Sequence, residues 1–202
     1  MNSQFWDEKF RMTPYLYGEG PNEFFKEQLL LLSTGKVLLP GEGEGRNALY
    51  ASALGWDVTA LDQSYIAQKH TLLKADALGL KLHYHVGDVT HFNPEPECFD
   101  LIGLIYFHLP PTILQEVHQK FERSLKKGGS IIIEGFGKNQ LQYSSGGPKN
   151  LEMLYDINEI KSSFTNIHWE LESDGIIHLK EGEGHSGDGH VIRLLGKKQS
   201  KG

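Results

Sequence analysis

Residues 37–62 constrain the fold more than any other part of this chain. A short apolar run ends at Gly41, Gly43 and Gly45, and a helix-forming segment follows these glycines. A second apolar run then ends at the acid Asp62. An α/β sheet uses this order of strand, glycine turn, helix, strand and carboxylate to hold a nucleoside across the carboxyl ends of parallel strands. The glycines let the backbone approach the ligand, and the acid can accept hydrogen bonds from ribose hydroxyls.

The glycine spacing indicates which nucleoside the turn holds. Dinucleotide-binding folds use G-x-G-x-x-G, whereas this chain has G-x-G-x-G followed by Arg46. The P-loop pattern is also absent, because no Gly-Lys-Ser/Thr follows the turn. The spacing resembles that of the class I methyltransferases, which use S-adenosylmethionine. A nicotinamide-dependent oxidoreductase remains a disfavoured alternative.

Apolar runs alternate with helical patterns, as they do in βαβ units. The expected strands are residues 36–40, 56–61, 81–86, 99–105 and 129–135, and the expected helices are 45–54, 64–79, 111–126 and 157–163. Two further β segments, 165–173 and 189–196, are joined by a Gly-rich stretch. The pattern predicts a Rossmann-like, doubly wound α/β fold. Its seven-stranded, mostly parallel sheet has one antiparallel strand near an edge and helices on both faces.

Several helix ends carry recognisable local signals. Ser64 is expected to cap the second predicted helix, and Pro110 with Pro111 to begin the third. Gly128 and Gly129 are expected to end that third helix. Asp156, with an acid three residues later, predicts a capping box for the short helix.

The length of 202 residues predicts one methyltransferase-sized domain over 1–202. Within it, residues 1–33 are expected to form an aromatic lid and a helix. Residues 34–135 would form the cofactor-binding half, and 136–202 a substrate loop with a C-terminal hairpin. The polar stretch 135–150 would supply that loop.

Charge and composition narrow the partners and the compartment. The formal net charge of −6 and the scattered lysines argue against a nucleic-acid partner or an anionic membrane. The longest apolar run is too short to span a bilayer, and the N-terminus does not resemble a signal peptide. A single cysteine, Cys98, suits a reducing compartment, so a cytoplasmic location is expected. The sequence leaves the oligomeric state open.

Two more strand ends are expected to reach the site. Asp88 follows the third strand, where it could accept a hydrogen bond from the adenine 6-amino group. His108 follows the fourth strand and is the candidate general base. Each has a structural alternative, because acids commonly follow strands as turn residues and His108 could satisfy loop backbone. Zinc binding by His178, His185 and His190 is a minor alternative, because no helix face pairs them.

Nearly the whole chain resembles bacterial S-adenosylmethionine-dependent methyltransferases, in particular the tellurite-resistance and thiopurine methyltransferase-like proteins. The resemblance rests on residues 5–7, 17–18, 21–22, 41–48, 58–62, 99–102, 184–187 and 191–193. It implies that Trp6 and Tyr17 fold over the methionine end of the cofactor. Such families usually have an acid two residues before the first glycine. This chain has Leu39 there, so Glu42 and Glu44 are candidates to compensate.

The expected function is methyl transfer from S-adenosylmethionine to a small molecule such as a thiol or a chalcogen compound. Soft nucleophiles need little help from a base. The alternative is a non-catalytic protein that binds the nucleoside. The expected cofactor-binding residues are Trp6, Tyr17, Gly41, Gly43, Gly45, Asp62, Gln63, Asp88, Val89 and Ile105, with His108 catalytic and no metal. Asn139, Tyr143 and the Gly146-Gly147 turn are expected to shape the acceptor site.

Overall fold

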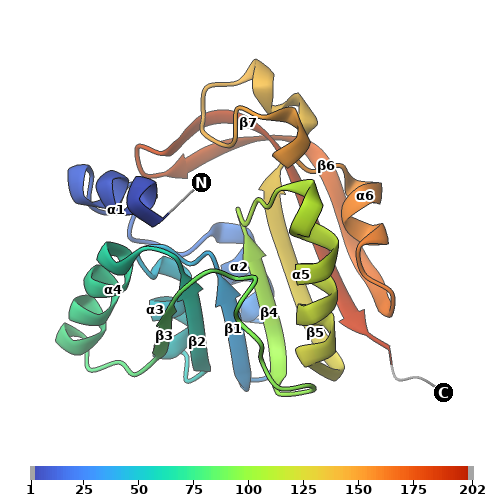
Figure 1. The fold of residues 1–202 in the computed structure, drawn as a ribbon, viewed down its shortest axis with the longest axis horizontal. Coiled ribbons are helices and arrows are strands. Elements are labelled where there is room, and N and C mark those ends of the chain that lie inside the picture. The colour runs from blue at the N-terminus through green and yellow to red at the C-terminus, as the bar shows by residue number, and fades with distance from the viewer. Residues whose placement is uncertain (1–2, 200–202) are drawn as a thin grey trace.

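The computed structural model describes residues 3–199, whose seven strands form one sheet in the order β3-β2-β1-β4-β5-β7-β6 (Figure 1). The strands are β1 Lys36–Pro40, β2 Asp57–Asp62, β3 His83–Val86, β4 Phe99–Ile105, β5 Leu125–Phe136, β6 Ile167–Glu181 and β7 His185–Lys198. Strands β1 to β5 run parallel. Strand β7 is antiparallel to both of its neighbours. The predicted fold class and the antiparallel orientation of 189–196 are confirmed.

The helices are α1 Ser3–Met12, α2 Glu23–Leu29, α3 Arg46–Ala53, α4 Tyr65–Ala77, α5 Pro111–Ser124 and α6 Ile157–Ser162, with short 3₁₀ helices at Lys138–Gln142 and Leu151–Met153. The Ser64 hydroxyl accepts a hydrogen bond from the Ala67 amide (3.1 Å), as a helix N-cap does. Asp156 caps α6, although Glu159 binds Lys138 instead of closing a capping box. The predicted end of α5 at Gly128-Gly129 is wrong, because both glycines lie within β5.

Side chains of the central strands alternate between two apolar layers, as expected for a parallel sheet that is buried on both faces. Leu38, Ile102 and Ile131 pack with residues of α5 and α6. Val37, Leu101 and Ile132 belong to a second cluster, formed with residues of α2 and α3. Each helix layer therefore covers one face of the sheet, and the strand ends are left to form a site.

The C-terminal hairpin is longer than the predicted strands 165–173 and 189–196. Its pairing continues from Gly175 opposite Val191 to Glu181 opposite His185, so only residues 182–184 form the turn. The Gly-rich stretch expected as a connection is mostly strand, because cross-strand pairing overrides its weak β propensity. The Gly184 amide donates to the Leu16 carbonyl at 2.8 Å, which fixes the hairpin tip against the N-terminal segment.

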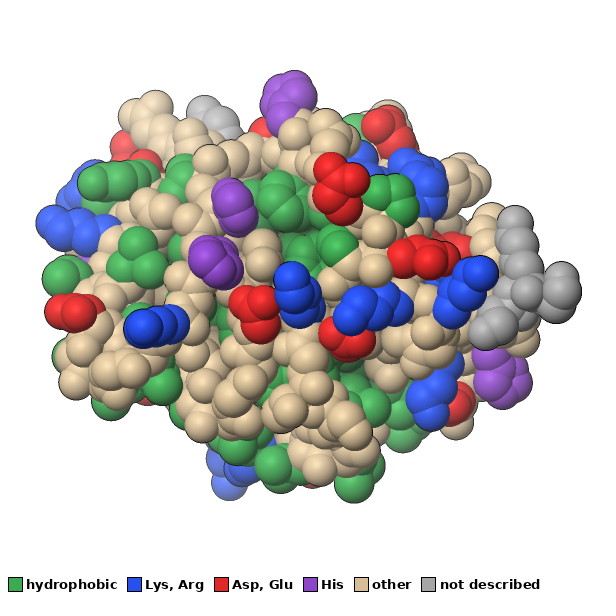
Figure 2. Space-filling view, turned by 90° about the horizontal axis from the view of Figure 1, so that it is seen from below, with side chains coloured by type: hydrophobic (Ala, Val, Ile, Leu, Met, Phe, Trp, Pro, Cys, Tyr) green, Lys and Arg blue, Asp and Glu red, His purple; other side chains and the backbone are tan. Residues whose placement is uncertain are grey.

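Figure 2 shows the molecule from below, at the end where the parallel strands begin and away from their carboxyl ends. Basic and acidic side chains are interspersed over this face, with apolar side chains between them. None of the helices in residues 3–199 combines the length and the apolar character needed to cross a membrane.

Candidate functional site

The glycine turn after β1 has a backbone that only glycine adopts readily. Gly41, Gly43 and Gly45 have φ of +66°, +60° and +80°. A Cβ atom on Gly41 would lie 2.6 Å from the Phe107 ring, and one on Gly45 would lie 2.3 Å from Thr71. At Gly43 the nearest atom is instead the tip of the Phe10 ring, at 3.2 Å. The space beside Gly43 is thus filled by a side chain of α1 and not by backbone.

Asp62 is the last residue of β2 and lies directly beside the glycine turn. Its Oδ2 accepts a hydrogen bond from the Gly43 amide at 3.0 Å, and its Oδ1 accepts one from the Ser64 amide at 2.9 Å. Burial raises the pKa of Asp62, and the hydrogen bonds from Ser64 and Gly43 oppose this effect. A carboxylate has about four acceptor sites, so Asp62 retains capacity for ribose hydroxyls. Gln63 follows at the start of the β2–α4 connection.

Asp88 lies next to the end of β2, since the Gly87 amide donates to the Asp62 carbonyl at 2.9 Å. The exposed Asp88 carboxylate accepts hydrogen bonds from the amide and the hydroxyl of Thr90, which lower its pKa. Both acceptor contacts use Oδ1. The half-buried Val89 follows it, and Ile105 lies 7% exposed at the end of β4. The sequence-predicted strand ends therefore lie along one edge of the sheet.

Helix α1 packs against α4, on the side of the molecule where the parallel strands end (Figure 1). Phe10 is 2% exposed against Gly43, and Trp6 stacks on Phe10 with ring centroids 5.6 Å apart. The Asp7 carboxylate accepts hydrogen bonds from the Ser64 hydroxyl (2.6 Å) and from an amide in the first turn of α4. This acid at a helix N-terminus fixes α1 over the glycine turn.

Arg46 connects the N-terminal segment with the hairpin. Its guanidinium donates to the Tyr17 carbonyl (3.0 Å) and to the Glu181 carboxylate (2.9 Å). The Tyr17 ring packs on His185, with centroids 4.5 Å apart, and its hydroxyl accepts a hydrogen bond from Lys9. Tyr17 thus lies at the junction of the glycine turn, the hairpin and α1.

A second set of buried charges lies beneath this junction. The Asn22 amide group donates to both Glu134 (2.6 Å) and Glu181 (2.8 Å). Arg193 donates to the other oxygen of Glu134 at 2.6 Å. Burial alone would raise the pKa of Glu181, but hydrogen bonding to His185 and the charge of Arg46 bring it to about 2. The Glu181 carboxylate is therefore ionised in the folded protein at neutral pH.

The N-terminus of α3 does not face open space for an anion. One oxygen of Glu42 accepts hydrogen bonds from the Asn47 and Ala48 amides, both at 2.8 Å. Glu42 therefore occupies these two amides, and they are not available to the carboxylate of a ligand. Burial raises the pKa of Glu42 to about 7, despite these hydrogen bonds.

The structure also explains why Leu39 stands where the resembled families usually have an acid. Leu39 is 1% exposed and packs against Phe25 over Gly103, where a Cβ would lie 2.7 Å from the leucine side chain. An acid in this environment would be buried without a partner. Glu44 accepts a hydrogen bond from the Leu16 amide and lies 2.7 Å from His70. Both acids expected to compensate for Leu39 therefore have partners within the protein.

His108 is half-buried, and backbone groups engage both of its ring nitrogens. Its Nδ1 lies 2.8 Å from the Met153 carbonyl, and its Nε2 accepts a hydrogen bond from the Phe136 amide at 3.1 Å. Burial lowers the pKa of His108 to about 4. In this arrangement neither nitrogen can take a proton from an acceptor, so the geometry favours the structural alternative.

His185 is enclosed mainly by aromatic side chains. Its ring contacts Tyr17, Tyr106 and Phe136, with centroids 4.5, 4.2 and 5.1 Å away. The segment 135–150 also reaches it, because a Cβ on Gly146 would lie 2.8 Å from the His185 ring. The sequence drew attention to this segment in one way, because residues 184–187 are among the motifs on which the family resemblance rests.

The remaining polar loop is held by the hairpin. The Gln140 side chain accepts a hydrogen bond from the His190 amide (2.8 Å) and donates one to Ser145. The Asn139 amide donates to the His190 ring at 3.3 Å. Asn139 therefore contributes to the anchoring of the loop, whereas Gly146 and Gly147 approach His185 and Phe136.

The three histidines considered for zinc each pair with a different acid and do not form one site. His178 pairs with Asp188, His185 with Glu181, and His190 with Asp174. Within residues 3–199, no group of three His, Cys, Asp or Glu side chains is placed to hold a metal ion.

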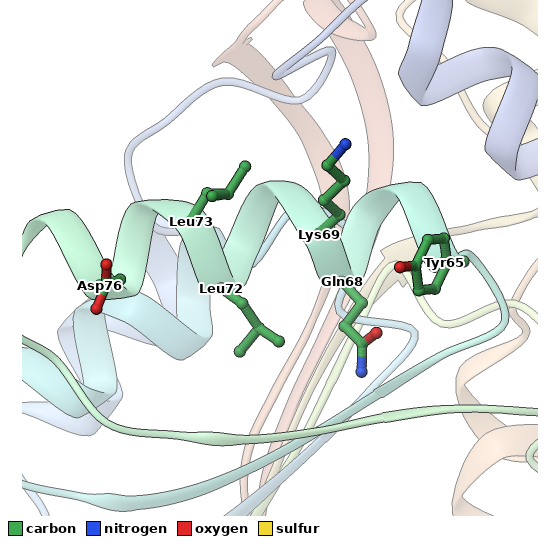
Figure 3. Close-up of a pocket in the computed structure, with 6 residues that line it drawn as sticks. All are labelled: Tyr65, Gln68, Lys69, Leu72, Leu73 and Asp76. Atoms are coloured by element: carbon green, nitrogen blue, oxygen red, sulfur yellow. The ribbon is translucent and has the colours of Figure 1, made fainter.

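A pocket on the outer side of α4 lies apart from this site (Figure 3). All the residues that line it belong to that one helix: Tyr65, Gln68, Lys69, Leu72, Leu73 and Asp76. It contains neither the glycine turn nor the acids that follow β2 and β3. We therefore assign the chemistry to the strand ends and not to this surface.

Comparisons with known proteins agree with this geometry. Residues 37–129 match the family described as "Methyltransferase domain". No protein with a curated description matches the sequence.

Solved structures with similar folds cover almost the whole chain. One, described for the conversion of a disulfide bond into a thioacetal group during echinomycin biosynthesis, is 19% identical, with a TM-score of 0.75 over 98% of this chain and 92% of that one. TehB from Haemophilus influenzae is 19% identical, with a TM-score of 0.73 over 98% and 67%. A SAM-dependent methyltransferase from Methanosarcina mazei is 17% identical, with a TM-score of 0.69 over 84% and 95%. The chain thus shares the fold of these structures, and residues 37–129 of it match the methyltransferase-domain family.

Proposed function

We propose that this chain methylates a small, soft nucleophile, a thiol or a related chalcogen compound, at the carboxyl ends of β1, β2 and β4. The observation that carries the proposal is the hydrogen bond between Asp62 and Gly43. It brings a buried carboxylate and a glycine cradle together at one point, which suits a ribose beside a close backbone approach.

The residues fit S-adenosylmethionine in three respects. The cradle at Gly43 is closed only by the Phe10 ring, which a cofactor could replace if α1 shifts. Asp62 keeps free acceptor capacity for the ribose, and Asp88 is exposed beside it for the adenine amino group. Trp6 and Tyr17 lie above the turn as the aromatic cover. When bound, the cofactor supplies an electrophilic methyl group on its sulfonium.

The chain's own contribution is to position the acceptor and to exclude water. Tyr17, Tyr106, Phe136 and His185 form an aromatic wall above the ends of β4 and β5. Removing water around a polarizable sulfur or selenium nucleophile strengthens its attack. Packing against the rings would hold that atom in line with the methyl group. The similar structure tied to thioacetal formation also concerns a sulfur compound, which supports this acceptor class.

Transfer of labelled methyl groups tests the proposal directly. The purified chain is incubated with methyl-labelled S-adenosylmethionine and a panel of alkyl thiols, aryl thiols, thiopurines, selenite and tellurite, with catechols and amines for comparison. Label should appear on members of the thiol and chalcogen group in preference to catechols and amines. Binding of the cofactor without transfer to any of these acceptors would support the nucleoside-binding alternative and contradict the proposal.

A further inference from the structure

His185 combines burial, enclosure and one ring nitrogen without a hydrogen bond. The residue is 5% exposed, and its ring lies among Tyr17, Tyr106 and Phe136. Its Nδ1 lies 3.4 Å from Glu181 Oε2. Its Nε2 has no hydrogen-bond partner among residues 3–199. This is the reverse of His108, whose two nitrogens both bind backbone groups.

The Nε2 atom of His185 lies beside the loop that contains Gly146. A Cβ on Gly146 would lie 2.8 Å from Cδ2 and 3.4 Å from Nε2 of His185. Gly146 has φ of +119°, a conformation that side-chain-bearing residues avoid. The loop therefore passes close to this edge of the imidazole without a side chain that would cover it.

Glu181 is fixed independently of His185. Arg46 binds the same oxygen that faces the imidazole, at 2.9 Å, and Asn22 binds the other oxygen at 2.8 Å. A carboxylate held in this way keeps the proton of a neutral imidazole on Nδ1 and leaves the Nε2 lone pair free. It would also stabilise the imidazolium that forms when Nε2 takes a proton.

We propose that His185, oriented by Glu181, is the general base that removes the proton of the acceptor thiol. The inference rests on the proposed function and specifies it further: the acceptor enters as a protonated thiol or selenol and not only as a preformed anion. The S–H proton passes to Nε2, and the sulfur lone pair attacks the methyl carbon. The bond from that carbon to the sulfonium breaks, and its electron pair leaves with S-adenosylhomocysteine.

The electrostatic surroundings of His185 agree with this role. The charged or titratable groups that face it are Glu181 of β6, Arg46 of α3, Lys9 of α1, Tyr17, and Tyr106 and His108 after β4. Burial lowers the pKa of His185, and the contact with Glu181 opposes this effect. The imidazole is therefore neutral near physiological pH, as a base must be before it accepts a proton.

The test compares two acceptors that differ in ionisation. His185→Gln is assayed with an alkyl thiol, which is mostly protonated at neutral pH, and with an acidic aryl thiol that is already ionised. Loss of a general base should slow the alkyl thiol by about 10²-fold or more and leave the aryl thiol within about threefold. For the alkyl thiol, kcat/KM of the variant should keep rising with pH toward the pKa of the thiol itself. Equal effects on both acceptors, or none on either, would overturn the proposal.

A matched control and a measurement on the parent protein complete the test. His178→Gln changes an exposed histidine of the same hairpin that pairs with Asp188, so it should leave both rates unchanged. S-adenosylhomocysteine binding should be the same in all three proteins, which separates a catalytic loss from misfolding.

In the parent, nitrogen NMR should show His185 as a neutral imidazole with its proton on Nδ1, and the Nε2 signal should shift when the alkyl thiol donates a hydrogen bond to it beside S-adenosylhomocysteine. A proton on Nε2, or an Nε2 signal that the thiol leaves unchanged, would refute the role even if His185→Gln failed to fold. If the parent methylates no thiol at all, the proposed function itself fails, and this outcome is distinct from equal rates in parent and variant.

Discussion

Among the individual residues of the glycine turn, the two glutamates stabilise the protein and are not free to bind ligand. Glu42 caps α3, and Glu44 fixes the Leu16 amide and lies against His70. Ionisation of Glu42 lowers the stability of the folded protein, because the carboxylate is buried and loses its proton only above about pH 7. Its folded-state pKa lies above the usual value of 4.5, so the folded state binds a proton that the unfolded state has released.

This difference predicts the pH dependence of Glu42→Gln. The parent should lose stability as the pH rises from about 4.5 through 7, and the loss should reach roughly 3 kcal/mol near pH 8. A glutamine keeps the oxygen that accepts both amides and cannot ionise. Urea unfolding at about pH 5 and pH 8 should therefore show the variant gaining on the parent only at the higher pH. A constant difference between the two proteins at both pH values would refute the assignment.

The histidines show where residue-level reasoning from sequence reaches its limit. Asp62 could be predicted because a strand, a glycine turn and a second strand are local patterns that place the acid at a known end of the sheet. Which of His108 and His185 has a ring nitrogen free to act as a base could not be predicted, because this depends on which backbone groups reach each ring. Met153 and Phe136, which engage His108, are far from it in sequence. Gly146, which borders His185, belongs to another loop.

Among the elements, α1 is the one that we expect to respond most directly to cofactor binding. It contacts the glycine turn through Phe10 and the start of α4 through Asp7. The sequence predicted an aromatic cover here from the density of rings before β1. Its docking by Asp7 on a helix N-terminus could not be foreseen, because that contact joins residues 57 positions apart.

Hydrogen exchange should reveal this coupling. S-adenosylmethionine bound beneath α1 should slow amide exchange across residues 5–22, because the lid then closes over a ligand and opens less often. Exchange in α6, on the layer shared with α5, should not change and provides the internal control. Unchanged protection of 5–22 at saturating cofactor would mean that the aromatic rings only pack on the sheet.

For the hairpin of β6 and β7, the sequence predicted the element itself but not its length. Its existence and antiparallel direction followed from the alternation of residues 165–173 and 189–196. Its full length did not, because Gly175, Gly187 and Gly189 lower β propensity, and pairing with the facing strand decides the structure instead. The additional length carries Glu181 and His185 to the site.

For the molecule as a whole, a buried charge network joins parts of the chain that are distant in sequence. Glu134 is fully buried and is held by Arg193 of β7 and by Asn22 before α2. Asn22 also binds Glu181, so the N-terminal segment, the sheet and the hairpin share one set of hydrogen bonds. No local pattern predicts this network, although the sequence did predict the seven-stranded sheet in which it lies.

Breaking this network on one side should be costly. Arg193→Met leaves the Glu134 carboxylate buried without its cation and should lower the free energy of unfolding by roughly 3–5 kcal/mol. Adding Glu134→Gln should restore much of that loss, because the amide carries no charge to bury. Urea unfolding of the parent, the single variants and the double variant measures the coupling. Additive losses in the double variant would contradict a direct charge pair.

Calorimetric titration with S-adenosylhomocysteine shows whether the glycine turn and Asp62 form the cofactor site. The parent should bind, and Asp62→Ala should lose about 1.5–3 kcal/mol of binding free energy, since a charge-assisted contact to ribose hydroxyls is removed. Asp57→Ala, at the exposed start of the same strand, should bind like the parent. Circular dichroism confirms that each variant is folded. A folded Asp62→Ala protein that binds S-adenosylhomocysteine as tightly as the parent would contradict the account.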